Sequence, residues 1–127
     1  MDESNSHIGS CLQDPRLFEA HDFFNSRKWY EAHDLFEELW HETIGPERRT
    51  LQGFLQVAVA QVHLERGNIN GATLLFGEGL GRLREKGTPD LGFDLHLLCE
   101  CVESLLSSLQ HKYDPDPFLL PSLVIKE

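Results

Sequence analysis

Apolar residues recur every three to four positions along most of the chain, the spacing that places them on one face of an α-helix. Turn-forming residues interrupt this pattern at Asn25-Ser26, Gly45-Pro46, Gly67-Asn68 and Gly87-Thr88-Pro89. The uninterrupted stretches predict five helices, at about residues 14–24, 28–43, 46–66, 69–85 and 93–112. The sequence therefore predicts an all-α protein.

The helix at about 46–66 is expected to be central, because its apolar residues point to nearly all of its sides. The order of residue types in 32–40 is echoed in 72–80, and a turn precedes each stretch. This echo predicts two helical hairpins of similar design, resembling tetratricopeptide pairs. With two copies only, we expect a compact bundle of about five helices and not an extended solenoid.

The length of the chain, 127 residues, suits one domain. Residues 1–13 offer little to bury and are expected to form a mobile N-terminal tail. The helical domain is predicted to span residues 14–113. Residues 114–127 begin with Asp114-Pro115-Asp116-Pro117, which cannot continue a helix, and then turn apolar. This C-terminal tail is expected to lie extended over the domain, since so much apolar surface is costly to leave in water.

Charge and cysteine content narrow the classes of partner and compartment. Eleven Lys and Arg residues stand against 21 Asp and Glu residues, so the net charge of −10 argues against binding nucleic acid. No stretch approaches the roughly 20 apolar residues of a membrane span, and no secretory signal is visible. The three cysteines are odd in number, and Cys99-Glu-Cys101 lacks the spacing of a redox or zinc motif. We expect reduced thiols and a cytoplasmic location.

A polar stripe marks the helix at about 28–43. His33 and Glu37 are four residues apart and must lie side by side, and Trp40 follows one turn further along the same face. The stripe also carries bulky apolar residues, so this face is expected to be partly buried.

A second stripe marks the central helix, where Gln52, Gln56, Val59 and His63 share one face. Burying such polar groups without partners costs about 1–3 kcal/mol each. We therefore expect the two stripes to face each other, so that their side chains satisfy one another or a ligand.

The expected pocket combines His33, Glu37 and His63 as metal ligands with Gln52, Gln56 and Trp40 as contacts to a polar ligand. Two imidazoles and a carboxylate suit one divalent metal such as zinc, manganese or iron, and leave a coordination position open. The alternative is a fully satisfied hydrogen-bond network that only fixes how two helices pack. HxxxE is a short pattern, and it does not identify a reaction.

Other chemistry-bearing residues have simpler explanations. Gly77, Gly79 and Gly81 look like a phosphate-binding loop, but they fall inside a helical pattern, where close approach of another helix is the expected reason. Cys99 and Cys101 are expected to be small packing residues and not nucleophiles.

An ordered run of motifs resembles domain-of-unknown-function family 309, a group of small all-helical proteins that are mainly bacterial and archaeal. The resemblance covers about residues 17–85, and its hallmark HxxxExx(W/Y) corresponds to His33, Glu37 and Trp40. It implies an all-helical fold and a suggested capacity to bind metal, without an established activity. The glycines at 77, 79 and 81 depart from the Ala- and Leu-rich helix expected of the family. The motifs are Phe24-Asn25, Tyr30-Glu31-Ala32-His33, Glu37-Glu38-Leu39-Trp40, Leu51-Gln52-Gly53, Gln56, His63, Gly67-Asn68 and Gly71-Ala72.

Two functions follow as expectations. The first is binding of a divalent metal or a small polar ligand in the pocket between the second and third predicted helices. The alternative is a non-catalytic interaction or scaffolding module. In that case the hairpins and residues 118–125 would contact a protein partner or a second copy in a homodimer, and the polar stripes would only specify packing.

Overall fold

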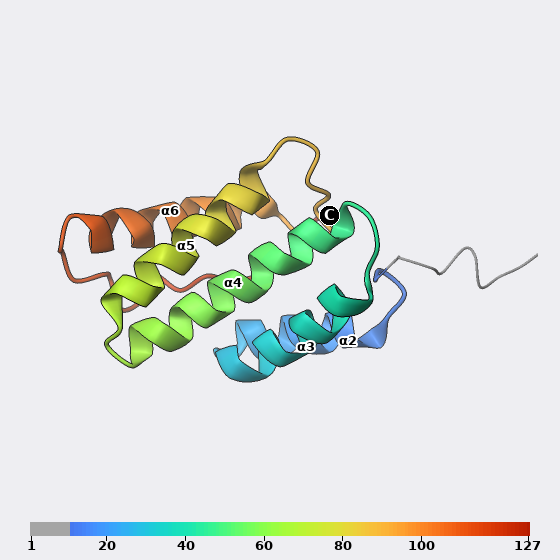
Figure 1. Ribbon diagram of the computed structural model, residues 1–127, viewed down its shortest axis with the longest axis horizontal. Coiled ribbons are helices and arrows are strands. Elements are labelled where there is room, and N and C mark those ends of the chain that lie inside the picture. Colours follow the sequence, from blue (N-terminus) through green and yellow to red (C-terminus); the bar gives the residue numbers. More distant parts are fainter. Residues whose placement is uncertain (1–10) are drawn as a thin grey trace, which may run out of the picture.

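The computed structural model describes residues 11–127, and this part of the chain folds into five α-helices (Figure 1). They are α2 (Pro15–Asn25), α3 (Trp29–Glu42), α4 (Glu47–Glu65), α5 (Ile69–Arg84) and α6 (Leu95–Gln110). The β-type pairing described in this range is one isolated antiparallel bridge, between Phe93 and Ile125. The predicted all-α class is confirmed, and each helix begins and ends within two residues of its predicted position.

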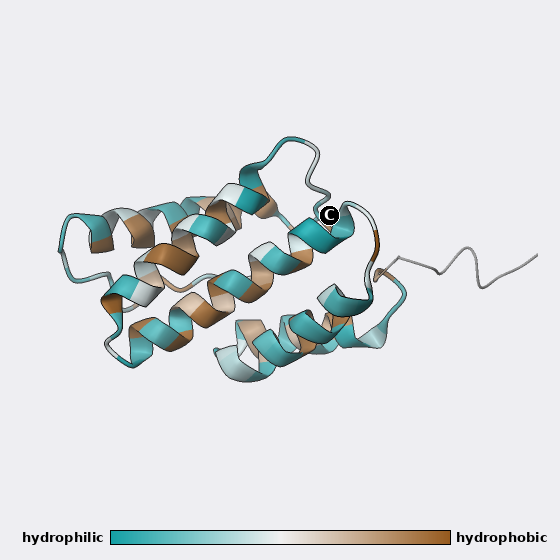
Figure 2. Ribbon diagram, in the orientation of Figure 1, coloured by the Kyte–Doolittle hydropathy of each residue, from teal (hydrophilic) through white to brown (hydrophobic). Residues whose placement is uncertain are grey.

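The helices pack in chain order. α4 lies between α3 and α5, while α2 packs on α3 and α6 packs on α5. In Figure 1, α3, α4 and α5 lie in front, and α2 and α6 lie behind them. This arrangement confirms a compact helical bundle around α4. Figure 2 shows hydrophobic and hydrophilic residues alternating around the helices, the pattern of amphipathic helices that bury one side.

The helix ends explain why the boundaries were predictable. The side chains of Asp14, Asn68 and Asp94 each accept a hydrogen bond from a backbone N–H in the first turn of the following helix. At the turn between α4 and α5, Gly67 has a φ of +78°, which side chains with a Cβ disfavour. Capping residues and this glycine therefore define the helix limits locally.

A chain of aromatic rings forms the centre of the core. The Phe24 ring meets the Trp29 ring edge-on, with centroids 5.0 Å apart, and the rings of Phe36 and Phe54 continue the series 5.4 Å apart. Phe93, in the connection between α5 and α6, packs 5.8 Å from Phe54. These contacts tie α2, α3, α4 and the connection before α6 into one core.

Two glycines allow α4 and α5 to approach closely. A Cβ on Gly53 would lie 2.7 Å from the Leu83 side chain, and one on Gly79 would lie 3.2 Å from both the Gly53 carbonyl oxygen and Val57 Cγ2. The expected reason for the glycines in α5, close helix approach, therefore holds for Gly79. It does not hold for Gly77 and Gly81, because a Cβ there would meet only Leu106 at 4.0 Å or nothing within 4 Å.

The C-terminal segment crosses behind the helices and is fixed to α2. The buried Leu123 donates its backbone N–H to Asn25 Oδ1 (2.8 Å), and its carbonyl accepts hydrogen bonds from Asn25 Nδ2 (3.0 Å) and His21 Nε2 (3.0 Å). Lys126 donates its backbone N–H to the Gly92 carbonyl (2.8 Å) and pairs through its ammonium with Asp90. We call residues 121–126 the C-terminal strap.

The predicted N-terminal tail, residues 1–13, lies mostly outside the described residues. Its described end includes Cys11, which is buried and donates its backbone N–H to Glu47 Oε1 at 3.3 Å. The chain is therefore anchored to α4 three residues before the predicted domain start at 14, and the three-part division of the chain stays a prediction.

The glycine contacts predict opposite effects for two similar substitutions. Gly79→Ala should lower the free energy of unfolding by about 1 kcal/mol, because overpacking against α4 outweighs the better helix propensity of Ala. Gly77→Ala should raise it by about 0.5–1 kcal/mol, because its Cβ has room. Urea unfolding followed by circular dichroism measures both, and equal shifts of the same sign would contradict the proposed close approach.

The strap contacts predict that Asn25→Ala lowers the free energy of unfolding by about 1–2 kcal/mol, since two hydrogen bonds to Leu123 are lost. The Leu123 amide should then exchange its hydrogen faster. The matched control is Asn70→Ala, which changes an exposed asparagine on α5. An unchanged exchange rate at Leu123 in the Asn25 variant would show that the strap is held by other contacts.

Candidate functional site

His33 and Glu37 lie side by side on α3. His33 Nε2 is 3.8 Å from Glu37 Oε2, and His33 Nδ1 is 3.3 Å from Asp34 Oδ1. The His33 side chain is 22% exposed, whereas the Glu37 side chain is 45% exposed. Both side chains are therefore partly buried, as expected for this face, with Glu37 more exposed than His33.

A small pocket of about 160 Å³ brings His33 together with His63. α3 contributes Tyr30 and His33, and α4 contributes Val59, Val62, His63 and Arg66. We call it the histidine pocket. Of the predicted site residues, His33 and His63 line it, and Glu37 lies beside His33 without lining it.

The turn between α4 and α5 determines the tautomer of the neutral His63 ring. Asn68 caps α5, because its Oδ1 accepts a hydrogen bond from the Gly71 N–H at 3.0 Å. The amide nitrogen of Asn68 must then point the other way, and it lies 3.0 Å from His63 Nδ1. An amide NH₂ can only donate, so Nδ1 accepts and the proton of the neutral ring is on Nε2.

The partner of His63 differs from that of a typical metal-binding histidine. A histidine that binds metal normally donates its second ring N–H to an acceptor, but Asn68 offers His63 Nδ1 a donor. In residues 11–127, moreover, no group of three or more His, Cys, Asp or Glu side chains is placed to hold a metal ion. The donors described here do not form a metal site by themselves, and a role for His33, Glu37 and His63 as ligands stays a prediction.

The glutamines of the central helix do not join the histidine pocket. Gln56 is buried against α5, where its Nε2 donates to Glu78 Oε1 (3.2 Å) and its Oε1 accepts from Arg82 Nη1 (3.3 Å). Gln52 also lies on the side of α4 that faces α5. The prediction that this stripe faces the α3 stripe is wrong for both glutamines. α4 packs against α3 on one side and against α5 on the other. The spacing of residues shows which of them share a face of α4, but it does not show which neighbouring helix that face contacts.

Trp40 also lies away from the histidine pocket. The guanidinium carbon of Arg48 sits 3.9 Å from the centre of the Trp40 ring, and Arg48 Nε donates to the Trp40 carbonyl at 3.1 Å. The indole N–H of Trp40 is buried and has no hydrogen-bond partner in the described part of the chain. Trp40 therefore positions Arg48 through a cation–π contact.

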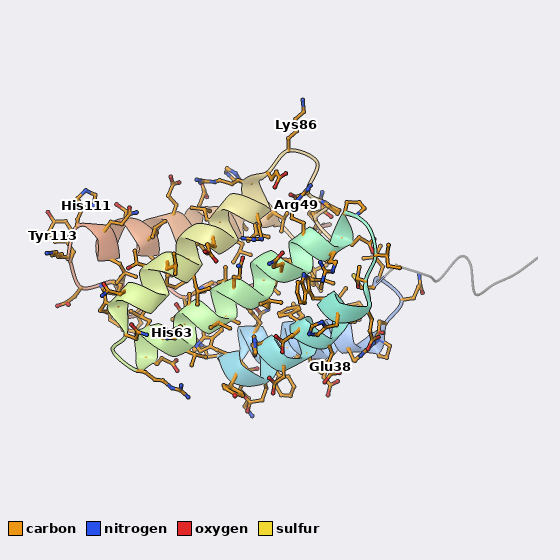
Figure 3. All side chains as sticks on the ribbon, in the orientation of Figure 1. Glu38, Arg49, His63, Lys86, His111 and Tyr113 are labelled. Carbon is orange, nitrogen blue, oxygen red and sulfur yellow. The ribbon has the colours of Figure 1, made fainter. Side chains whose placement is uncertain are left out.

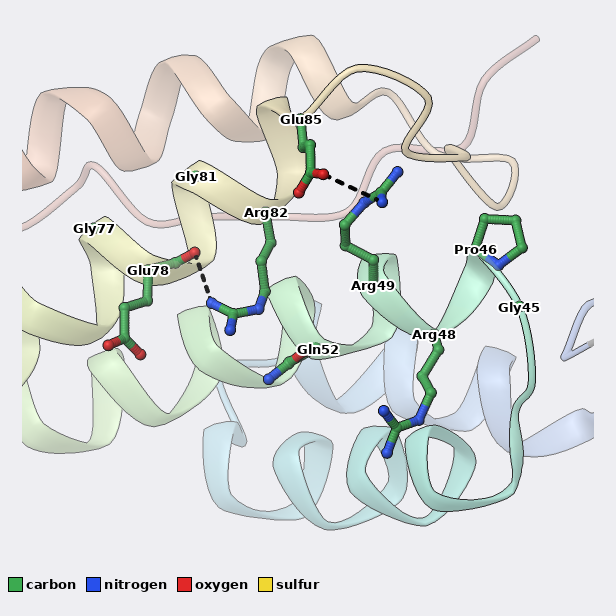
Figure 4. A pocket seen from close by; sticks show the side chains of 10 residues that line it. All are labelled: Gly45, Pro46, Arg48, Arg49, Gln52, Gly77, Glu78, Gly81, Arg82 and Glu85. Carbon is green, nitrogen blue, oxygen red and sulfur yellow. Dashed lines mark hydrogen bonds and ion pairs between the residues drawn. The ribbon is translucent and has the colours of Figure 1, made fainter.

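A larger groove of about 740 Å³ lies between the start of α4 and the second half of α5 (Figure 4). Three arginines line it, together with two glutamates. Figure 3 shows that Arg49 in this groove and His63 lie toward opposite ends of α4, so the groove and the histidine pocket are separate. The sequence pattern did not predict this groove, because its walls are more than 20 positions apart in sequence. Its lining residues are Gly45, Pro46, Arg48, Arg49, Gln52, Gly77, Glu78, Gly81, Arg82 and Glu85.

The surroundings of the three cysteines disfavour the reactive thiolate form. Burial raises the pKa of the Cys11 thiol to about 12, with a further contribution from Glu47, and burial raises the pKa of Cys101 to about 11. Burial also raises the pKa of Cys99. All three thiols are free, and a thiol must lose its proton to react.

Comparison with known proteins supports the family resemblance. Residues 17–75 match the model of the family described as "Domain of unknown function (DUF309)". The chain is 33% identical over 92 residues to a protein named "Uncharacterized protein YpuF" from Bacillus subtilis (strain 168). That match covers 70% of this chain and 53% of the relative, so the chain spans about half the length of the relative. The segment 17–75 belongs to the DUF309 family.

The fold also bears on membrane insertion. In the described residues, no helix is both long enough and apolar enough to cross a membrane.

The tautomer of His63 is directly testable. Asn68→Asp keeps an oxygen that can cap α5, but it replaces the donor facing His63 with an acceptor. We expect the ring proton to move from Nε2 to Nδ1, which nitrogen-15 chemical shifts of the imidazole report. The exposed His96 serves as the control and should not change. An Nδ1-protonated ring in the unmodified protein would contradict the assignment.

Proposed function

We propose that this domain binds a small polar ligand in the histidine pocket by donating hydrogen bonds to it. The observation that supports this most directly is that two imidazoles from different helices, His33 on α3 and His63 on α4, line the same pocket. Holding two such groups together at a half-buried site favours a ligand that satisfies them.

The chemistry of the lining points to a ligand that carries acceptor oxygens. His63 offers an Nε2–H donor, Arg66 offers a guanidinium group and Tyr30 offers a hydroxyl. The volume of about 160 Å³ lies below the range of drug-sized sites, so the ligand is small. A compact carboxylate, or the carboxylate end of a larger molecule, fits both properties.

A divalent metal remains the other proposed occupant, as the HxxxExxW motif suggests. It is less favoured, because the Asn68 amide presents a donor to His63 and Glu37 does not line the pocket. The free thiols fit our further proposal that the domain works in a reducing compartment such as the cytoplasm.

A non-catalytic interaction module is the second candidate. It is supported by large apolar side chains on the surface, with Phe118 90% exposed and Tyr113 71% exposed. Helices that pack in chain order, as in tetratricopeptide pairs, are also common in interaction modules. Under this proposal the histidines would contribute to packing only.

The first proposal is tested with acetate as the probe, in a nuclear magnetic resonance titration of the backbone amides. Acetate should shift the amides of Val59, Val62 and Arg66, and His63→Leu should weaken its binding by about tenfold because a donor to the carboxylate is lost. The control is His96→Leu. His96 and Glu100 repeat the HxxxE spacing on α6, with a ring–carboxylate distance of 3.2 Å, but His96 is 81% exposed.

The results of the titrations distinguish between the proposed functions. Absence of acetate shifts at these amides, or unchanged binding in the His63 variant, would refute ligand binding by donation. Zinc or manganese added in separate titrations should leave the rings of His33 and His63 unaffected. If these ions shift both rings, the metal proposal replaces the first one.

A further inference from the structure

The groove between α4 and α5 differs in charge from the rest of this acidic chain. It gathers Arg48, Arg49 and Arg82, while the chain as a whole has a net charge of −10. Its volume is about 740 Å³, and it is widely open to solvent. Two carboxylates, Glu78 and Glu85, also line it, so the groove carries an excess of positive charge by one group.

Neutral groups hold two of the guanidinium groups in place. Arg48 is oriented by the Trp40 ring and carbonyl, and Arg82 Nη1 donates to Gln56 Oε1 (3.3 Å) and to the Glu78 carbonyl (3.4 Å). Within residues 11–127, neither Arg48 nor Arg82 has a carboxylate partner. Each guanidinium has five N–H donors, so both retain donors for a ligand. In the view of Figure 4, Gln52 lies between them.

Arg49 differs from Arg48 and Arg82, because its guanidinium group pairs with a carboxylate that also lines the groove. It pairs with Glu85 at 3.5 Å and donates to Thr88 Oγ1 at 2.7 Å. These contacts tie the start of α4 to the connection after α5. The charge available to a ligand therefore comes mainly from Arg48 and Arg82.

The glycines on the α5 wall provide an independent observation. Glycine in a helix interior is less stable than alanine, and Gly53 and Gly79 compensate by letting two helices meet. Gly77 and Gly81 have no such reason, because a Cβ on either would have room. Both line the groove, where a bare helix surface lets a ligand come close to the backbone.

We propose that this groove binds a small organic oxyanion that also carries hydroxyl groups, with its phosphate or carboxylate held by the guanidinium group of Arg82, while Arg48, beyond Gln52, adds positive charge to the same groove. The flat fork of a guanidinium group matches two oxygens of either oxyanion. Glu78 and Glu85 accept hydrogen bonds from hydroxyl groups and repel an extended polyanion, which selects for a compact ligand. The site is separate from the histidine pocket and does not depend on the function proposed for that pocket.

Isothermal titration calorimetry tests this with ribose 5-phosphate, citrate and uncharged ribose as probes. Ribose 5-phosphate or citrate should bind, and the tighter of the two identifies the oxyanion. Ribose should not bind. Arg82→Gln should weaken binding by about tenfold, since charge-assisted hydrogen bonds are lost. The matched control is Arg84→Gln on the same helix, because Arg84 pairs with Glu103 outside the groove.

Gly81→Ala provides a second test that does not rely on a charge. It should raise the midpoint of thermal unfolding, because alanine favours the helix, and yet weaken oxyanion binding several-fold because its methyl group enters the groove. His63→Leu should leave this binding unchanged, so failure of the histidine pocket can be told apart from failure of the groove. The proposal is overturned if neither charged probe binds at millimolar concentration, or if Arg82→Gln and Arg84→Gln have equal effects.

Discussion

The close approach of α4 and α5 is the constraint on which most of this structure depends. It exists because Gly53 and Gly79 place bare backbone where the two helices cross. The short separation brings Gln56 within reach of Glu78 and Arg82, so a buried amide finds partners on the neighbouring helix. It also sets the walls of the arginine-lined groove. Packing at one crossing therefore determines the polar contacts on both sides of it.

The sequence was sufficient for the helices, because the signals that start and stop them are local. Asp14, Asn68 and Asp94 cap helices with their own side chains, and Gly67 supplies the turn that follows α4. The central place of α4 was predictable for the same reason, since a helix with apolar residues on nearly every side must be surrounded. The periodicity of the apolar residues was sufficient to predict the central position of α4.

The site was less predictable, because it depends on which helix a polar residue meets. Spacing placed Gln52, Gln56 and His63 on one face of α4, but α4 touches α3 on one side and α5 on the other. His63 joins the histidine pocket, while Gln56 pairs with α5. Arginines more than 30 positions apart, such as Arg49 and Arg82, converge only in the folded chain. Contacts of this kind leave no periodic signal.

The HxxxE spacing illustrates the same limit. It occurs on α3 at His33 and Glu37 and again on α6 at His96 and Glu100, with ring–carboxylate distances of 3.8 and 3.2 Å. The local geometry is similar, and the α6 pair is even closer. Only the surroundings differ, since His33 shares a pocket with a second histidine while His96 faces solvent. Whether a short motif contributes to a pocket therefore depends on the helix that packs opposite it.

The C-terminal strap has a consequence for the order in which the chain folds. Each helix packs on its neighbour in the chain, so the helical contacts close short loops and form early. The hydrogen bonds between Asn25 and Leu123 instead join residues 98 positions apart. Closing so long a loop costs more conformational entropy than closing the short loops between neighbouring helices. We therefore expect the strap to dock on α2 after the neighbouring helices have packed on one another.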